Sequence, residues 1–151
     1  MPQSLSVVYI HLVFSTKDRR PFLRDAPVRA ELHRYLGEIS RRLECPPIAI
    51  GGVEDHVHLL VRFGRTVTPA EWVKEIKRVS NQWLKGQDPA LADFEWQSGY
   101  AAFSVSQSNV AQVMEYIARQ GERHRKRTFQ EELRAFLRKH EMEWDVRYVW
   151  D

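Results

Sequence analysis

The sequence predicts an α+β fold, with one antiparallel sheet and several helices built from a single chain of 151 residues. Three observations support this prediction. Short runs of β-branched and aromatic residues recur along the chain, and stretches with apolar residues three or four positions apart separate them. Two Thr-x-x-Glu capping boxes, at 68–71 and 128–131, mark the starts of helices. No repeat or long linker interrupts the pattern, so residues 1–151 are expected to form one domain.

The first half of the chain contains three predicted strands and one helix. Residues 5–15 are apolar at both alternating sets of positions, which predicts a first strand with two apolar faces. The helix, at 27–44, has proline at its start and ends before a proline pair. The second strand, at 47–54, leads through two glycines into the third, at 56–63.

The second half contains one more strand and three helical segments. A helix begins at the 68–71 capping box, and a strand at 99–106 follows it. A helix at about 110–120 and a final one from Thr128 complete the chain. The order β-α-β-β-α-β followed by helices is the ferredoxin-like, or RRM-like, arrangement. Two helices are expected to cover one face of such a sheet and to leave the other face available for a ligand.

Two histidines lie one residue apart in the third predicted strand, within the stretch GGVEDHVHLLVRF at 51–63. Residues two apart in a strand point to the same side, so His56 and His58 project together while Val57 points into the core. Neutral imidazoles are common ligands of divalent metals, and Asp55 is a candidate acceptor that would orient a ring. The pattern alone also fits two polar side chains on a hydrated face. A metal site would need a third ligand from elsewhere.

Tyr116 and Gln120 are four residues apart in VMEYIARQ, at 113–120, and therefore share one face of a predicted helix. From that face a phenol and a carboxamide can approach the same ligand. Taken alone, the pair is a weak signal and is more typical of a tyrosine that packs in the core. Its combination with the histidine pair favours a functional site.

Basic residues cluster, whereas acidic residues are scattered and the formal net charge is only +3. Such clusters favour contacts with nucleic-acid phosphates, and solvated helix surfaces are the alternative. The residues expected to bind DNA are Lys74, Lys77, Arg78, Arg123, Arg125, Lys126 and Arg127. The single Cys45, the lack of a signal-peptide pattern and the lack of an apolar run of about 20 residues predict a cytoplasmic protein that is not in a membrane.

Together, these motifs resemble those of the HUH-superfamily single-tyrosine transposases, the enzymes of small bacterial insertion sequences and of their REP-associated relatives. The resemblance rests on DHVHLLV at 55–61, YIARQ at 116–120, HLVFSTKDRRPFL at 11–23 and the basic C-terminal segment, and it covers nearly the whole chain. HUH denotes His, hydrophobe, His, which is His56-Val57-His58 here. The resemblance implies that Tyr116 is the nucleophile and that Gln120 is the third metal ligand.

The resemblance also implies a reaction. The chain would cleave and rejoin single-stranded DNA that carries a hairpin, through a covalent 5′-phosphotyrosine intermediate. Mg²⁺ or Mn²⁺ is the expected cofactor, no nucleotide cofactor is expected, and a homodimer is the expected assembly, in which Tyr116 acts with the histidines of either chain. Two alternatives remain: a catalytically silent RRM-like nucleic-acid-binding module, and a metal hydrolase that uses water and releases a free 5′-phosphate.

Overall fold

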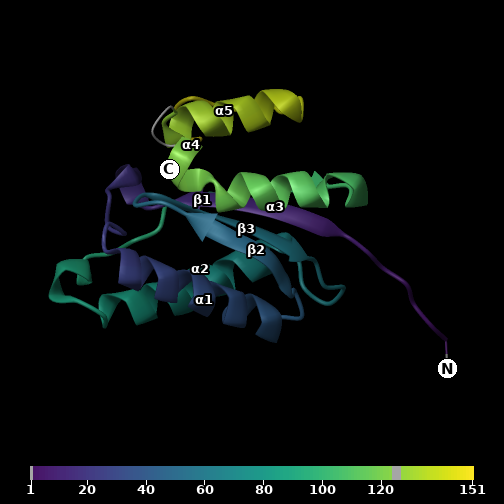
Figure 1. The fold of residues 1–151 in the computed structure, drawn as a ribbon, viewed down its shortest axis with the longest axis horizontal. Helices are drawn as coiled ribbons and strands as arrows, with labels where there is room; N and C mark the ends of the chain where they lie inside the picture. Colours follow the sequence, from purple (N-terminus) through teal and green to yellow (C-terminus); the bar gives the residue numbers. More distant parts are fainter. Residues whose placement is uncertain (1, 124–126) are drawn as a thin grey trace.

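The centre of the computed structural model is a four-stranded antiparallel sheet (Figure 1). The structure describes residues 2–123 and 127–151, except for the side chains of residues 122 and 123. The sheet has the order β2-β3-β1-β4 and consists of β1 (Tyr9–Ser15), β2 (Pro47–Gly52), β3 (His56–Arg62) and β4 (Ala101–Val105). This strand order, with a helix after β1 and another after β3, is the predicted βαββαβ arrangement. The fold prediction is therefore confirmed.

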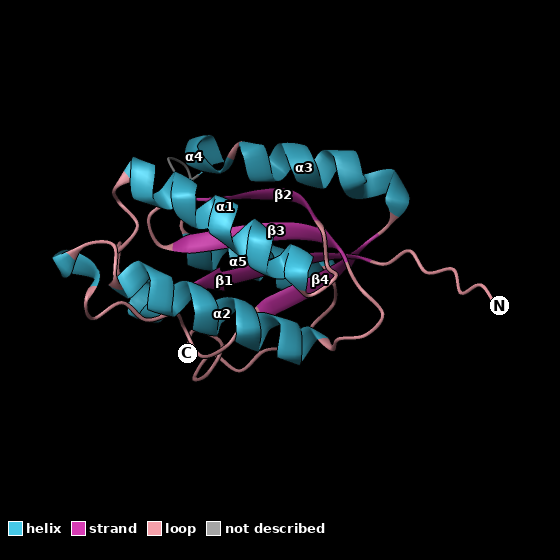
Figure 2. Ribbon diagram, turned by 90° about the horizontal axis from the view of Figure 1, so that it is seen from below, coloured by secondary structure: helices cyan, strands magenta, loops and turns pink. Residues whose placement is uncertain are grey.

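Helices cover both faces of the sheet (Figure 1). On one face, α1 (Ala26–Arg42) and α2 (Pro69–Lys85) lie side by side (Figure 2). On the other lie α3 (Val110–Ala118), the short α4 (Gln120–Arg123) and α5 (Phe129–Lys139). Three 3₁₀ turns complete the regular structure: η1 (Lys17–Arg19), η2 (Pro89–Leu91) and η3 (Gln107–Asn109). The second face was expected to be available, and instead the C-terminal helices cover it.

The alternation of side chains along the strands produces two separate cores. Val57, Leu59 and Val61 of β3 pack with α1 and α2 in the larger core. On the opposite face, Val13 of β1 and Phe103 of β4 pack against three residues of α5: Phe129, Leu133 and Leu137. The two central strands, β1 and β3, therefore bury both of their faces, whereas Ser104 of β4 is exposed.

Local hydrogen bonds determine where several of the helices and strands begin. The hydroxyl of Thr68 accepts a hydrogen bond from the Glu71 backbone N–H at 3.1 Å, and Thr128 accepts one from Glu131 at 3.2 Å, so both predicted capping boxes start helices. β1 begins at Tyr9 rather than at residue 5, because its pairing with both neighbouring strands ends there. Leu5, beyond that point, is 85% exposed.

In the described part of the chain, no helix is both long and apolar enough to span a bilayer.

Candidate active site and metal centre

β3 presents the two histidines toward the layer formed by α3, α4 and α5. His56 lies opposite Ser15 of β1, and His58 lies between Val13 of β1 and Gly51 of β2. Both imidazoles are 0% exposed. The histidines therefore share one face, as the two-residue spacing predicted, but this face is buried under the C-terminal helices and is not hydrated.

His56 is oriented by the residue beside it. Its Nδ1 lies 2.7 Å from Asp55 Oδ1, the acceptor that the sequence indicated. A neutral His56 that donates through Nδ1 presents the lone pair of Nε2, which lies 3.2 Å from Gln120 Oε1. The Gln120 amide in turn donates from Nε2 to the Tyr116 carbonyl at 3.4 Å, which turns its oxygen toward the imidazole. The His56 nitrogen and the Gln120 oxygen are thus close enough to share a proton in a hydrogen bond or to coordinate one metal ion.

His58 lies between a third histidine and a carboxylate. Its Nδ1 is 2.8 Å from His11 Nε2, and its Nε2 is 2.7 Å from Glu132 Oε1. Burial, and next the charge of His58, lower the pKa of His11 well below its ordinary value, which favours a neutral His11 ring in the hydrogen bond with His58. With that contact, His58 presents Nε2 toward Glu132, which is 2% exposed.

The donor atoms around this point fit a divalent cation. One ligand atom from each of His56, His58 and Glu132 lies within 4.8 Å of the other two, and Gln120 adds an amide oxygen beside His56. Ligands about 2.0–2.2 Å from one ion can be at most about 4.4 Å apart, so only small side-chain movements separate this arrangement from coordination. Imidazole nitrogens with carboxylate and amide oxygens suit ions such as Mn²⁺ and Zn²⁺, and the oxygens also suit Mg²⁺.

Tyr116 lies beside this cluster within the same chain. Its ring centroid is 5.7 Å from that of His58 and 6.3 Å from that of His11. Tyr116 also lines a pocket of about 320 Å³ together with Glu132 and His11, and the other residues of the pocket include Asn109, Gln112, Arg127 and Lys139. The predicted phenol and histidine pair are therefore brought together, and Tyr116 itself lines a pocket with two cationic side chains.

Gly51 permits the close approach of α3 to the sheet. A Cβ at this position would lie 2.7 Å from the Ile117 carbonyl oxygen and 2.8 Å from Ile117 Cγ2, distances that real Cβ atoms essentially never show. We expect Gly51→Ala to push α3, and with it Tyr116, away from His58, and to lower the free energy of unfolding by about 1–3 kcal/mol. Urea denaturation measures this loss. Gly121→Ala is the matched control, because a Cβ there meets nothing within 4 Å, and unchanged stability in Gly51→Ala would contradict the packing role.

The residues predicted to bind DNA lie in two different places. Lys74, Lys77 and Arg78 belong to α2, on the face of the sheet opposite Tyr116, and Arg78 forms an ion pair with Glu75 at 2.6 Å. Arg127 is exposed and lines the pocket of Tyr116. Arg125, Lys126 and the side chain of Arg123 lie outside the described residues. Of the described members of the set, the structure brings only Arg127 to the tyrosine.

Lys77 makes backbone contacts that the sequence did not predict. Its ammonium donates to three backbone carbonyls, those of Gln97 at 2.8 Å, Ser98 at 3.3 Å and Gly99 at 2.6 Å. Burial lowers its pKa to about 8. These contacts use all three N–H donors of the ammonium, so Lys77 fixes the segment before β4 and its donors are not available to a phosphate.

Replacement of Lys77 is therefore expected to affect stability. Lys77→Met keeps a similar aliphatic length but leaves three carbonyls without their donor, and we expect the free energy of unfolding to fall by about 1–3 kcal/mol. Lys74→Met, on the exposed side of the same helix, should change it by less than about 0.5 kcal/mol. Urea denaturation of both variants checks this difference. Equal stabilities would mean that Lys77 does not hold the 97–99 segment.

Sequence reasoning missed Glu132, Lys139 and the position of His11 within the site. Glu132 follows the capping box of the last helix and lies between Phe129 and Phe136 on the same apolar face. A carboxylate on an otherwise apolar helical face indicates a buried functional group, so the sequence contained a sign of the role of Glu132. Alternation along the first strand predicts that His11 shares the face of the histidine pair, but its closeness to His58 depends on the pairing of β1 with β3.

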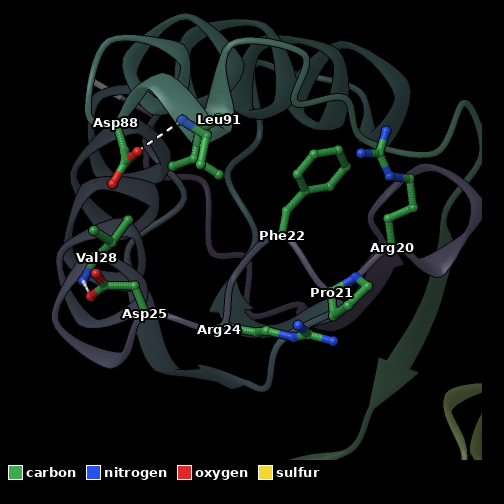
Figure 3. A pocket seen from close by; sticks show the side chains of 9 residues that line it. Arg20, Pro21, Phe22, Arg24, Asp25, Val28, Asp88 and Leu91 are labelled. Carbon is green, nitrogen blue, oxygen red and sulfur yellow. Dashed lines mark hydrogen bonds between the residues drawn. The ribbon is translucent and has the colours of Figure 1, made fainter.

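A separate pocket of about 360 Å³ lies at the N-terminal end of α1, beside η2 (Figure 3). Arg20, Arg24 and Phe22 line it, and the Arg20 guanidinium lies 4.3 Å from the centre of the Phe22 ring. Asp25 and Asp88 line the same pocket. Because the two carboxylates offset the two guanidinium groups, the pocket has no excess positive charge that would attract a phosphate.

Known proteins of similar fold include transposases. No curated protein is significantly similar to the chain. Among solved structures, a putative transposase from Deinococcus radiodurans R1 is 25% identical, with a TM-score of 0.62 over 80% of this chain and 95% of that one. A REP-associated tyrosine transposase bound to a REP hairpin is 12% identical, with a TM-score of 0.60 over 82% of this chain and 72% of that one, which shows a shared fold.

The family described as "Transposase IS200 like" matches residues 4–120, more than three quarters of the chain. The matched region includes β1, the histidine strand β3 and the helix that carries Tyr116, so it contains every predicted metal ligand and the predicted nucleophile. The resemblance drawn from the sequence motifs is thus confirmed, and the chain belongs to the IS200-like family of transposases.

Proposed function

We propose that this transposase cleaves and rejoins hairpin-bearing single-stranded DNA, with Tyr116 as nucleophile and a divalent cation held by His56, His58 and Gln120. The observation that supports this most strongly is the convergence of the Tyr116 ring and the buried histidine pair within one chain, with 5.7 Å between the Tyr116 and His58 ring centroids. The pocket that Tyr116 lines gives a phosphodiester a route to the phenol. The hairpin-bound structural relative supports a DNA substrate of this type.

Tyr116 performs the covalent step in this proposal. Its oxygen attacks the phosphorus, the bond from phosphorus to the 3′-oxygen breaks, and the products are a 5′-phosphotyrosine and a strand with a free 3′-OH. The phenolic proton is lost and the departing 3′-oxygen gains one. Attack by another 3′-OH on the phosphotyrosine then reverses the step and releases the phenol. The phosphodiester is conserved, so no nucleotide hydrolysis is required.

The remaining side chains position the reactants. His56 and His58 are held in place by Asp55 and His11, and Gln120 is directed by its contact with the Tyr116 carbonyl. When bound, the cation neutralises charge on the scissile phosphate and orients it for in-line attack. Mg²⁺ or Mn²⁺ is proposed as that cation. Because the imidazoles and the tyrosine lie on adjacent elements, little rearrangement is needed to align them.

The proposed DNA contacts are the cationic side chains that remain accessible. Arg127 lies at the pocket of Tyr116 and is placed to bind the phosphates near the cleavage site. Lys74 and Arg78, on the opposite layer, would contact a more distant part of the substrate, such as the hairpin stem. Arg123, Arg125 and Lys126 stay predicted contacts that lie outside the described side chains.

One chain brings Tyr116 and the histidine pair together, which supports action of Tyr116 with the histidines of its own subunit. A homodimer stays a prediction. A mixture of Tyr116→Phe and His56→Ala chains distinguishes the two arrangements, because subunits that share a site restore one complete site per mixed dimer. We expect no recovery of activity in the mixture. Recovery would assign the tyrosine to the histidines of a partner.

Incubation of the protein with end-labelled hairpin DNA and Mg²⁺ or Mn²⁺ tests the proposed reaction. The expected products are a DNA strand ending in 3′-OH and a protein–DNA adduct that survives denaturing electrophoresis. A metal hydrolase would instead release a free 5′-phosphate and leave no adduct. A silent binding module would retard the DNA in a native gel and leave every strand intact. Either result would overturn the proposal.

A further inference from the structure

The helix α5 carries a charged residue into the centre of the buried site. Phe129, Leu133 and Leu137 attach α5 to the sheet through the smaller core. Glu132 shares their helical face and is only 2% exposed. A carboxylate in such a position is costly unless a cation or hydrogen-bond donors compensate for its lost hydration.

The position of Glu132 matches that of a metal ligand. Its Oε1 lies 2.7 Å from His58 Nε2, and its ligand atom lies within 4.8 Å of those of both histidines. The contact is to the ring nitrogen that His58 presents toward the site, while the other nitrogen faces His11. Glu132 thus lies on the side of the imidazole where a metal ion would bind, and not on the side that orients the ring.

The charge of Glu132 changes the chemistry of the donor set. His56, His58 and Gln120 are neutral donors, and they provide no charge to balance a divalent cation. Carboxylate oxygens are preferred ligands of Mg²⁺ and Mn²⁺. Neutral imidazoles alone favour other ions, such as Zn²⁺. Glu132 lies beyond residues 4–120, the region that matches the family, so this ligand comes from a part of the chain that the match does not include.

We infer that Glu132 is an additional metal ligand, carried by α5, and that metal binding therefore secures α5 over the histidines. This inference rests on the proposed metal centre. Coordination by residues 56, 58, 120 and 132 joins β3, α4 and α5 at one point. The cation would then hold the cover of the site in place as well as act on the substrate.

Mn²⁺ binding to the DNA-free protein tests the ligand. The signal of unbound aqueous Mn²⁺ in electron paramagnetic resonance gives the dissociation constant without any assay of activity. We expect Glu132→Gln, which keeps size but removes charge, to weaken binding by about tenfold or more. Glu131→Gln is the matched control, since it removes the same charge from the exposed neighbouring position on α5 and should leave the affinity unchanged.

The His56→Ala variant separates failure of the inference from failure of the metal centre. Loss of Mn²⁺ binding in His56→Ala, together with normal binding in Glu132→Gln, would overturn the role of Glu132 and leave the proposed centre intact. Normal binding in both variants would overturn both. Tighter binding in Glu132→Gln would identify the carboxylate as a competitor of the metal and would also contradict the inference.

Hydrogen exchange on the unmodified protein gives a second test, which does not depend on whether a variant folds. Saturating Mg²⁺ should slow the exchange of backbone amides in α5 by about tenfold or more, because opening of α5 would break a metal–ligand bond. The amides of α1, on the opposite face, should be unaffected. Equal exchange of α5 with and without Mg²⁺ would contradict the coupling between the metal and this helix.

Discussion

Tyr116→Phe is expected to abolish covalent capture of DNA, lowering its rate by at least about a thousandfold. The substitution removes a single oxygen, the proposed nucleophile. The aromatic ring should keep its place, because its contacts with Phe136 and His58, at 5.3 and 5.7 Å between centroids, do not require the hydroxyl. The rate of adduct formation with labelled hairpin DNA, followed on denaturing gels, measures the effect.

Tyr35→Phe provides the matched control for this prediction. Tyr35 stacks on Trp83 between α1 and α2, on the opposite side of the sheet, so loss of its hydroxyl should leave the rate unchanged. Fluorescence anisotropy should show that Tyr116→Phe still binds the DNA with nearly normal affinity. An adduct formed at the normal rate by Tyr116→Phe would exclude this residue as the nucleophile.

His58→Ala is expected to have the second large effect, on both metal-dependent activity and stability. The variant removes a proposed ligand and also leaves the buried Glu132 without the imidazole 2.7 Å away. Breaking a buried polar pair of this kind typically costs about 3–5 kcal/mol. We therefore expect a loss of unfolding free energy of this size and no adduct formation even at high Mn²⁺ concentration.

A double-mutant cycle with Glu132→Gln isolates the pair from other consequences of the substitution. Once residue 132 is neutral, loss of the imidazole should be less damaging, so the double variant should be more stable than the sum of the two single effects predicts. Urea denaturation in the absence of metal measures all four proteins. Strictly additive effects would show that His58 and Glu132 do not stabilise each other.

The fold was predictable because its determinants are local. Alternation along the β3 sequence separated Val57 and Leu59 from His56 and His58, and the structure places these two sets on opposite faces. Thr68 and Thr128 marked helix starts through hydrogen bonds that span three residues. The closeness of Tyr116 and Gln120 was also predicted, but the single helix expected to carry both is wrong. α3 ends at Ala118 and Gln120 begins α4, so a contact between Gln120 and the Tyr116 carbonyl accompanies this relation instead of one continuous helix.

The remainder of the site depends on contacts between distant segments, which local pattern does not reveal. Glu132 approaches His58 only because α5 folds back over the sheet, and this docking depends on a core shared by Phe129 and Phe103. The same docking buries the histidine face that was expected to be available. The basic cluster in the sequence indicated that Lys77 was a surface cation, but the segment before β4 brings three carbonyls to its ammonium.

Identification of the residue that becomes attached to DNA tests the central claim most directly. After reaction with hairpin DNA and Mn²⁺, nuclease and protease digestion followed by mass spectrometry would locate the residual nucleotide on one peptide. We predict a 5′-phosphodiester on the oxygen of Tyr116. A nucleotide on any other side chain, or cleaved DNA with a free 5′-phosphate and unmodified protein, would contradict it.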